Sequence, residues 1–244
     1  MWIEREISSQ IARLATTRPV VVITGARQTG KTSLLRRLFP EHTFVTLDLP
    51  ATAAQADSDS PAFLSLHTAP LLIDEIQYAP NIFRYLKVDV DNHRDHYGRF
   101  ILTGSQKFLL MKGVSDSLAG RAAILELETL SYGEIIRSFP YISLNEILLR
   151  GGFPELYANK GIDRNEYFRS YLATYLERDV RALVKVASLR DFERFIRACA
   201  LRSGQLLNRS ELARDVGISP STAGEWLSIL ETSGQVFLHE PWFT

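Results

Sequence analysis

One short segment limits the fold of this chain more than any other feature: residues 25–32 read Gly-Ala-Arg-Gln-Thr-Gly-Lys-Thr. The five residues before it, 20–24, are all β-branched, which is typical of a buried strand. Residues 31–39 favour a helix, which Pro40 stops. A strand, a Gly-x-x-x-x-Gly-Lys-Thr loop and a helix in this order predict a phosphate-binding loop in an α/β fold.

The residue types in this loop suit a triphosphate and a divalent cation. Gly25 and Gly30 permit backbone angles and a close approach that a side chain would block. The loop amides and the start of the following helix would direct N–H donors at phosphate. Lys31 would place a positive charge on the β- and γ-phosphates, and the Thr32 hydroxyl could coordinate Mg²⁺. A chance glycine turn is the alternative, which the flanking strand disfavours. The predicted nucleotide-binding residues are Gly25, Ala26, Arg27, Gln28, Thr29, Gly30, Lys31, Thr32 and Ser33.

A second motif follows further along the chain, where the apolar residues 71–73 lead into Asp74 and Glu75. Asp74 is a candidate Mg²⁺ ligand acting through water, and Glu75 a candidate to orient and activate an attacking water. A solvated strand end is the alternative. A strand predicted at 43–47 lies between the two motifs, which suggests an extra strand inserted between them.

Strands and helices alternate over the first part of the chain, which predicts a mostly parallel sheet covered on both faces. Helices are expected at residues 3–16, 31–39 and 81–92, and a loop or weak helix at 51–60. The expected strands are 20–24, 43–47, 69–74, 100–103 and 123–127.

After about residue 130 the pattern becomes helical. Helices are predicted at 143–150, 164–184 and 189–203. The last forty residues resemble a helix-turn-helix, with helices at 210–216 and 220–232, Ser219 as the N-cap of the second and one strand at 235–239.

Composition excludes some classes of protein. The 244 residues contain 28 basic and 28 acidic side chains, so the formal net charge is zero and gives no indication of a nucleic-acid or membrane partner. Cys199 is the single cysteine, which rules out an internal disulfide and favours the cytoplasm. No apolar run approaches the roughly 18 residues that cross a bilayer, so no membrane partner is expected.

Six motifs extend the pattern over nearly the whole chain. Those at 25–32 and 72–77 are shared by many ATPases. The more particular ones are Leu-Thr-Gly-Ser at 102–105, Leu-Ala-Gly-Arg at 118–121, Leu-Ser-Tyr-Gly-Glu at 130–134 and Gly-Gly-Phe-Pro-Glu at 151–155. Together they resemble the AAA+-like P-loop ATPases with a winged helix, and more narrowly the bacterial and archaeal AAA-domain family with a C-terminal DUF4143 region.

This resemblance implies ATP and Mg²⁺ as ligands and a five-stranded sheet in the order 5-1-4-3-2. It implies a γ-phosphate sensor after the strand 100–103, for which Ser105 and Thr103 are both candidates; a helix-capping hydroxyl is the alternative. Arg121 stands where such proteins place an arginine finger for a neighbouring subunit, which implies a homo-oligomer; a surface arginine or an ion pair is the alternative. Pro154 resembles a lid proline that contacts adenine, although a plain helix-breaking turn fits equally well.

Three regions are expected: a P-loop ATPase domain at 1–135, a helical lid at 136–204 and a winged-helix-like domain at 205–244. Family members usually continue past the winged helix, so we expect a C-terminal truncation. The expected function is an ATP-hydrolysing molecular switch, because Asp74 and Glu75 favour hydrolysis over binding alone. A DNA-binding regulator is the alternative, but residues 219–233 contain no Lys or Arg. An unidentified protein partner for the winged helix is therefore favoured over DNA.

Overall fold

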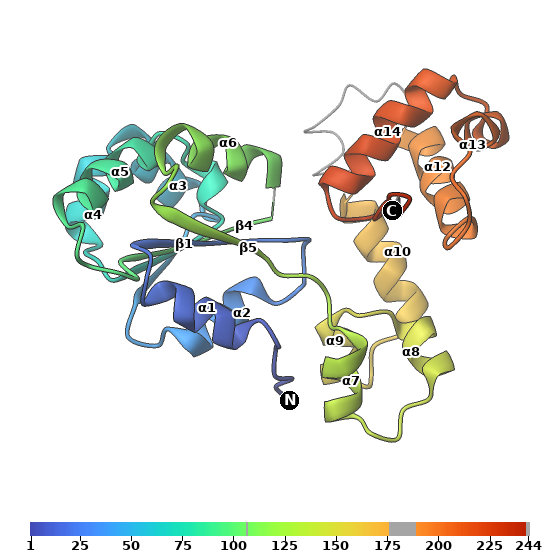
Figure 1. The fold of residues 1–244 in the computed structure, drawn as a ribbon, viewed down its shortest axis with the longest axis horizontal. Helices are drawn as coiled ribbons and strands as arrows, with labels where there is room; N and C mark the ends of the chain where they lie inside the picture. Colours follow the sequence, from blue (N-terminus) through green and yellow to red (C-terminus); the bar gives the residue numbers. More distant parts are fainter. Residues whose placement is uncertain (106, 176–188, 243–244) are drawn as a thin grey trace. The chain divides into compact units, whose positions relative to one another are not determined.

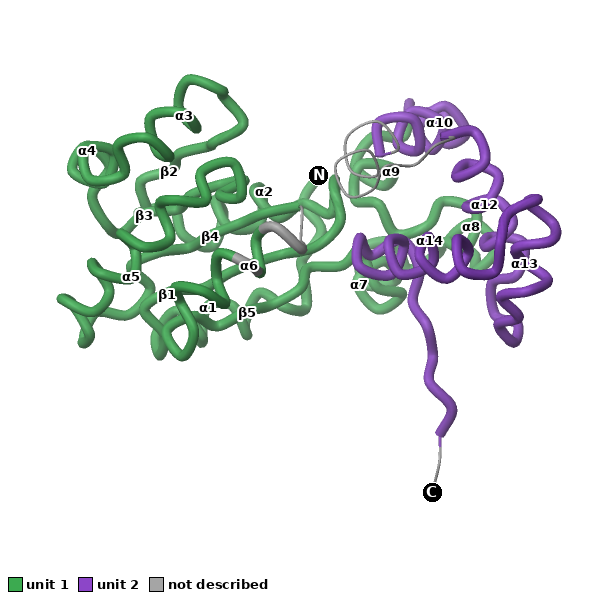
Figure 2. The backbone as a smooth tube through the Cα atoms, turned by 90° about the horizontal axis from the view of Figure 1, so that it is seen from above, with its two compact units in different colours: residues 1–160 green, residues 161–244 purple. Residues whose placement is uncertain are grey.

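The computed structural model describes residues 1–105, 107–175 and 189–242 (Figure 1). The chain divides into two compact units, Met1–Lys160 and Gly161–Thr244 (Figure 2). The boundary at Lys160 falls inside the region expected to be the helical lid. The three-region division therefore stays a prediction.

A five-stranded parallel sheet forms the centre of the first unit. Its strands are β1 (Val20–Thr24), β2 (Thr43–Thr46), β3 (Leu71–Asp74), β4 (Phe100–Gly104) and β5 (Ala122–Glu126). Their order is β2-β3-β4-β1-β5, with every neighbouring pair parallel. This is the predicted order 5-1-4-3-2 viewed from the other edge, so the expected P-loop fold is confirmed. All residues of β1, β3 and β4 are buried.

Two hydrophobic layers enclose the sheet, because successive side chains of a strand point to opposite faces. Val20 and Val22 of β1 join the core that packs under α4, α5 and α6. Val21 and Ile23 join a second core with residues of α1 and α2. Figure 1 shows α1 and α2 on one face and α3 to α6 on the other. The continuous apolar runs in the sequence thus result from burial on both faces.

The helices of the first unit follow most of the predicted ranges. They are α1 (Ser8–Ala15), α2 (Lys31–Leu38), α3 (Pro50–Ser58), α4 (Ser60–Leu66), α5 (Ile82–Asn92), α6 (Lys107–Ser117), α7 (Tyr132–Ser138), α8 (Leu144–Arg150) and α9 (Pro154–Ala158), with a 3₁₀ turn at Ile76–Tyr78. The segment expected as loop or weak helix at 51–60 is mostly α3, which starts with Pro50 at its first position. Proline suits that position because the first helical N–H has no partner within the helix.

The second unit is helical in its described part and contains α10 (Arg164–Tyr175), α12 (Leu189–Leu201), α13 (Arg209–Val216) and α14 (Pro220–Thr232). Its core includes Trp226, whose ring makes edge contacts with Phe192 and Phe195 at centroid distances of 5.1 and 5.5 Å. Ser219 caps α14 as predicted, accepting a hydrogen bond from Thr222 N. The predicted helix 164–184 is present as far as Tyr175, and its remainder lies outside the described residues.

The strand predicted at residues 235–239 is wrong: this segment has no regular secondary structure. The amides of Gln235 and Val236 instead bond back to the carbonyl of Leu230, at 2.7 and 3.3 Å. These two hydrogen bonds cap the C-terminal end of α14, in place of the strand pairing that the apolar residues had indicated. In the ranges that the structure describes, no helix is long and apolar enough to cross a membrane.

Candidate nucleotide-binding site

The loop after β1 has residues with positive φ, as its glycines predict. Gly25 and Gly30 have φ of 141° and 91°, and Gln28 has φ of 62°. A Cβ at Gly25 would lie 2.1 Å from the carbonyl oxygen of Leu127, just after β5. The close approach of Leu127 therefore requires glycine at this position, whether or not a ligand is bound.

Lys31 and Thr29 hold the loop together from inside. Lys31 is only 6% exposed, and its ammonium donates to the carbonyls of Gly25 and Ala26 at 3.0 and 2.8 Å. The hydroxyl of the fully buried Thr29 donates to Ala26 at 3.1 Å. The side chain of the predicted phosphate-binding lysine thus folds back onto the first residues of its own loop.

The two motifs meet at Asp74. The Thr32 hydroxyl donates to Asp74 Oδ1 at 2.8 Å, and the Thr103 hydroxyl donates to the same oxygen at 2.5 Å. Burial raises the pKa of Asp74, against the opposite effect of these two hydroxyl donors. Carboxylate and hydroxyl oxygens are hard ligands, which Mg²⁺ prefers, and their adjacency fits that cation. Sheet order explains the meeting, because β4 lies between β1 and β3.

Glu75 lies beside Asp74 in a left-handed backbone conformation, with φ of 55°. Its carboxylate oxygen Oε2 accepts hydrogen bonds from Gln77 Nε2, from Ser105 N at 3.2 Å and from Ser105 Oγ at 2.9 Å. Burial alone would raise the pKa of Glu75. The Gln77 hydrogen bond, the charge of Lys31 and the Ser105 donors outweigh burial and hold this pKa below its usual range. The structure thus brings Ser105 to the Glu75 carboxylate, whereas Thr103 donates to the Asp74 carboxylate and accepts the Glu75 amide at 3.2 Å.

Pro154 begins α9 and lies next to the loop, its Cγ 4.0 Å from the position of a Cβ on Gly30. Both residues line a cavity of about 370 Å³. Its walls come from the N-terminal segment, the loop, Leu130 and α9: Met1, Trp2, Ile3, Arg5, Gln28, Thr29, Gly30, Ser33, Leu130, Pro154, Glu155 and Ala158. The loop therefore adjoins a cleft with largely apolar walls, as nucleoside sites often do.

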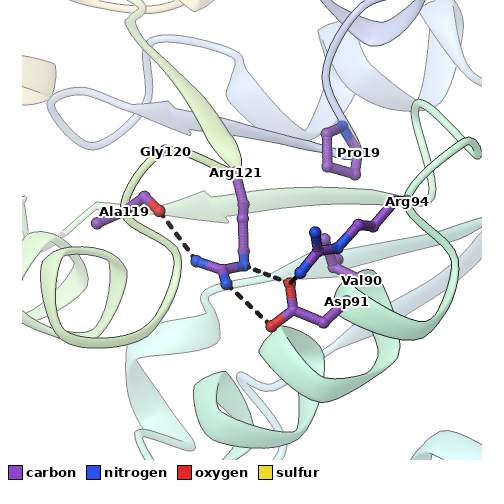
Figure 3. A pocket seen from close by; sticks show the side chains of 7 residues that line it. All are labelled: Pro19, Val90, Asp91, Arg94, Ala119, Gly120 and Arg121. Atoms are coloured by element: carbon purple, nitrogen blue, oxygen red, sulfur yellow. Dashed lines mark hydrogen bonds and ion pairs between the residues drawn. The ribbon is translucent and has the colours of Figure 1, made fainter.

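Arg121 lies away from the loop of its own chain. It directly precedes β5, which runs parallel to β1 with Ala122 beside Val20, so it lies at the opposite end of the strands. Its guanidinium forms two hydrogen bonds of 2.9 Å to Asp91 and one of 3.1 Å to the carbonyl of Ala119 (Figure 3). These residues line a second cavity of about 310 Å³, together with Arg94. The ion pair weighed for Arg121 is present.

Two residues near the site were missed by sequence reasoning. Arg5 is buried and bonds to the loop at Thr29 O and to Glu134, which is 129 positions away. Glu134 ends the motif at 130–134, but no pattern links it to Arg5, which stands in a run of charged residues typical of a solvated helix end. Helix α1 in fact begins only at Ser8.

The strand order, the loop after β1 and the acidic pair at the end of β3 define the fold of a P-loop nucleoside triphosphatase. Residues 17–136 match the family model described as an AAA domain. Residues 142–244 match a model described as a domain of unknown function, DUF8612, whereas the motifs had resembled the DUF4143 family. The matches and the sheet together support an AAA-like ATPase, and the narrower DUF4143 assignment stays a prediction.

Two mycobacterial proteins are similar over all of this chain. Uncharacterized protein Rv2008c of Mycobacterium tuberculosis and Mb2031c of Mycobacterium bovis are each 33% identical, and 55% of each is covered. The chain thus spans about half the length of these relatives. The Walker-type ATPase of Pyrococcus abyssi is 19% identical with a TM-score of 0.56, and the match covers 95% of this chain and 90% of that one. At this identity the likeness establishes the fold.

Proposed function

We propose that this chain binds ATP with Mg²⁺ and hydrolyses it to ADP and phosphate, acting as a molecular switch in the cytoplasm. One observation supports the proposal most: the 2.8 Å hydrogen bond from Thr32 to Asp74, with Glu75 adjacent. This bond joins the start of α2 to the end of β3, which are the two halves of a nucleotide site. The AAA-domain match over residues 17–136 supports the same activity.

Thr32 and Asp74 are the residues that would hold Mg²⁺, the second through a water molecule. The cation would neutralise charge on the β- and γ-phosphates, as in other phosphoryl-transfer sites. Asp74 is 6% exposed and already accepts two hydroxyl hydrogens, so its carboxylate is held in one orientation. Lys31 would exchange its contacts with the two loop carbonyls for phosphate oxygens.

Glu75 would orient the attacking water and accept its proton. Its lowered pKa keeps it ionised at neutral pH. The donors Gln77 and Ser105 occupy Oε2, which leaves Oε1 as the oxygen for water. Ser105 is the better placed of the two sensor candidates. A γ-phosphate that accepted a hydrogen bond from its hydroxyl would remove that hydrogen bond from Glu75. We assign Pro154 to the adenine side of the site, since it lines the cleft beside Gly30.

Arg121 would act only on the site of a neighbouring copy, because it lies at the other end of the strands from its own loop. Asp91 would hold it ready in the ligand-free state. This part of the proposal requires a homo-oligomer.

The test is nucleotide turnover as a function of protein concentration, with ATP and GTP side by side. Lys31→Ala should abolish ATP binding, whereas Lys87→Ala, at an exposed lysine of α5, should not. Glu75→Gln should keep ATP binding and lower turnover by about 10²–10⁴-fold, the usual contribution of a general base. Unchanged turnover in Glu75→Gln would remove Glu75 from this role.

Arg121→Ala should lower turnover per subunit, and wild-type turnover should rise with concentration as copies meet. Arg94→Ala is the matched control, since Arg94 lines the same cavity with a side chain that is 76% exposed. If wild-type turnover per subunit is independent of concentration and Arg121→Ala has wild-type turnover, Arg121 is not an arginine finger.

Three arginines in the described part of the second unit are already paired with carboxylates. Arg197 pairs with Glu193 at 2.7 Å, Arg194 with Asp191 at 3.5 Å, and Arg202 with Asp215. Phosphates would have to compete with these carboxylates. A protein partner for this unit therefore remains our preferred proposal.

A further inference from the structure

Arg5 is a buried cation next to the nucleotide loop. It is 7% exposed, and an arginine this deep requires an acceptor for each of its donors. The acceptors come from separate parts of the first unit. Nε bonds to Glu134 at 3.1 Å, Nη1 to the Thr29 carbonyl at 2.8 Å, and Nη2 to the carbonyls of Glu128 and Thr129 at 2.6 and 3.3 Å.

Glu134 completes the network from α7. Its Oε1 also accepts the amide of Glu6 at 2.7 Å, and its Oε2 accepts the amide of Ser131 at 2.9 Å. Ser131 in turn caps α7 by accepting from Glu134 N, so the helix start and the ion pair form one unit. The N-terminal segment, the loop, the connection after β5 and α7 thus share one guanidinium.

The bond to Thr29 O has a consequence for the loop. A peptide unit is planar and trans, so its C=O and N–H point in opposite directions. Arg5 fixes the Thr29 carbonyl and therefore turns the Gly30 amide of the same peptide to the other side. Gly30 has φ of 91° and no side chain, and as the N-cap of α2 it accepts the Leu34 amide at its carbonyl, at 2.9 Å. Its amide is one of the donors assigned to phosphate.

We infer that Arg5 is a positioning residue for the nucleotide, which acts through the Thr29–Gly30 peptide and orients the Gly30 amide toward the phosphates. The inference rests on the proposed ATP site and adds a residue from outside the loop to it. Arg5 supplies a donor to the Thr29 carbonyl from outside the loop, and the Thr29 hydroxyl is already bonded to Ala26. Guanidinium geometry suits this task, since one planar group serves the loop and Glu134 at once.

The double variant of Arg5 and Glu134 distinguishes a positioning role of Arg5 from a purely structural one, because the two roles predict different ATP affinities. Arg5→Met alone leaves the buried Glu134 carboxylate without its cation, which is strongly destabilising. Arg5→Met/Glu134→Gln removes both charges and keeps one amide oxygen as an acceptor, so part of the thermal stability lost in Arg5→Met should return. If Arg5 acts only on stability, ATP affinity should return with it. If Arg5 orients the loop, affinity should stay low.

The experiment uses the full chain, with ATP and Mg²⁺ titrated by calorimetry and thermal unfolding measured on each variant. We expect both Arg5 variants to bind ATP about tenfold to a hundredfold more weakly, the range for one lost charge-assisted hydrogen bond. Glu134→Gln alone should stay within about threefold of wild type by the same measure. Arg137→Met is the matched control, because Arg137 pairs with Glu6 at 2.7 Å on the exposed surface.

Wild-type affinity in Arg5→Met/Glu134→Gln would overturn the inference, at any melting temperature. So would an equal loss of affinity in Glu134→Gln. A wild-type chain that fails to bind ATP would instead overturn the proposed function, and the inference with it. The double variant also answers the question if Arg5→Met alone does not fold.

Discussion

Replacing Gly25 by alanine tests whether the nucleotide loop is constrained by the protein's own packing. The new Cβ would lie 2.1 Å from Leu127 O and 3.0 Å from Leu127 C, both rigid backbone atoms. We expect about 1–3 kcal/mol from the unfavourable φ and about 1–3 kcal/mol more from the clash. Gly120→Ala is the matched control: Gly120 also has positive φ, 76°, but no heavy atom lies within 4 Å of its Cβ position. Both variants place alanine at a positive φ, and Gly25→Ala alone adds the clash.

Hydrogen exchange of residues 20–24 without nucleotide is the assay, because buried central strands exchange mostly through large-scale opening of the sheet. A clash of about 1–3 kcal/mol makes exchange in Gly25→Ala roughly 5- to 150-fold faster than in Gly120→Ala. Equal exchange rates in the two variants would refute the reasoning, since they would mean that Leu127 moves away at no cost. A loss of ATP binding without faster exchange would assign Gly25 to the ligand alone.

Three further predictions concern the second unit. Trp226→Ala should cost about 3–5 kcal/mol in urea unfolding, because the side chain is 6% exposed between two phenylalanines. Trp242→Ala, at a side chain 90% exposed, should change stability by less than about 0.5 kcal/mol, and a comparable loss there would contradict the packing argument. Asn208→Ala should cost about 1 kcal/mol and speed exchange in α13, whose first amides Asn208 caps at 3.1 and 3.2 Å. Burial raises the pKa of Cys199 to about 11, and only the thiolate reacts, so alkylation should be slow at pH 8 and rise about tenfold per pH unit until near that pKa. Fast labelling of the folded chain at pH 8 would contradict that value, and labelling in urea supplies the control rate.

The sequence was informative where local pattern and chemistry coincide. The nucleotide loop follows the β-branched run of β1, the acidic pair Asp74-Glu75 lies at the end of β3, and parallel strands end at the same edge of a sheet. That geometry brought Thr32 to Asp74 as the motifs predicted. The strand order itself needed the family resemblance, because no local pattern tells which strands are neighbours.

Other features depend on contacts between distant positions, which a single sequence does not show. Arg5 and Glu134 are 129 positions apart; Arg5 resembles an ordinary surface charge, and the motif that ends at Glu134 does not indicate its partner. The Arg121–Asp91 pair had been weighed only in general terms. The strand expected at 235–239 failed for a related reason, since apolar alternation indicates a strand only when a neighbour is present to pair with it.

The pairing of β1 has a consequence for the order in which the chain folds. Val20 pairs with Phe100 on one side and with Ala122 on the other, whereas β2 and β3 pair over a shorter separation, Thr43 with Leu71. During synthesis at about 5–20 residues per second, the Val-Val-Val-Ile-Thr strand therefore remains without either partner for several seconds. A nascent chain that stalls before β4 would present an unpaired apolar strand, which is the kind of segment that aggregates or recruits chaperones. The strand that supports the nucleotide loop is thus the last in the sheet to be completed.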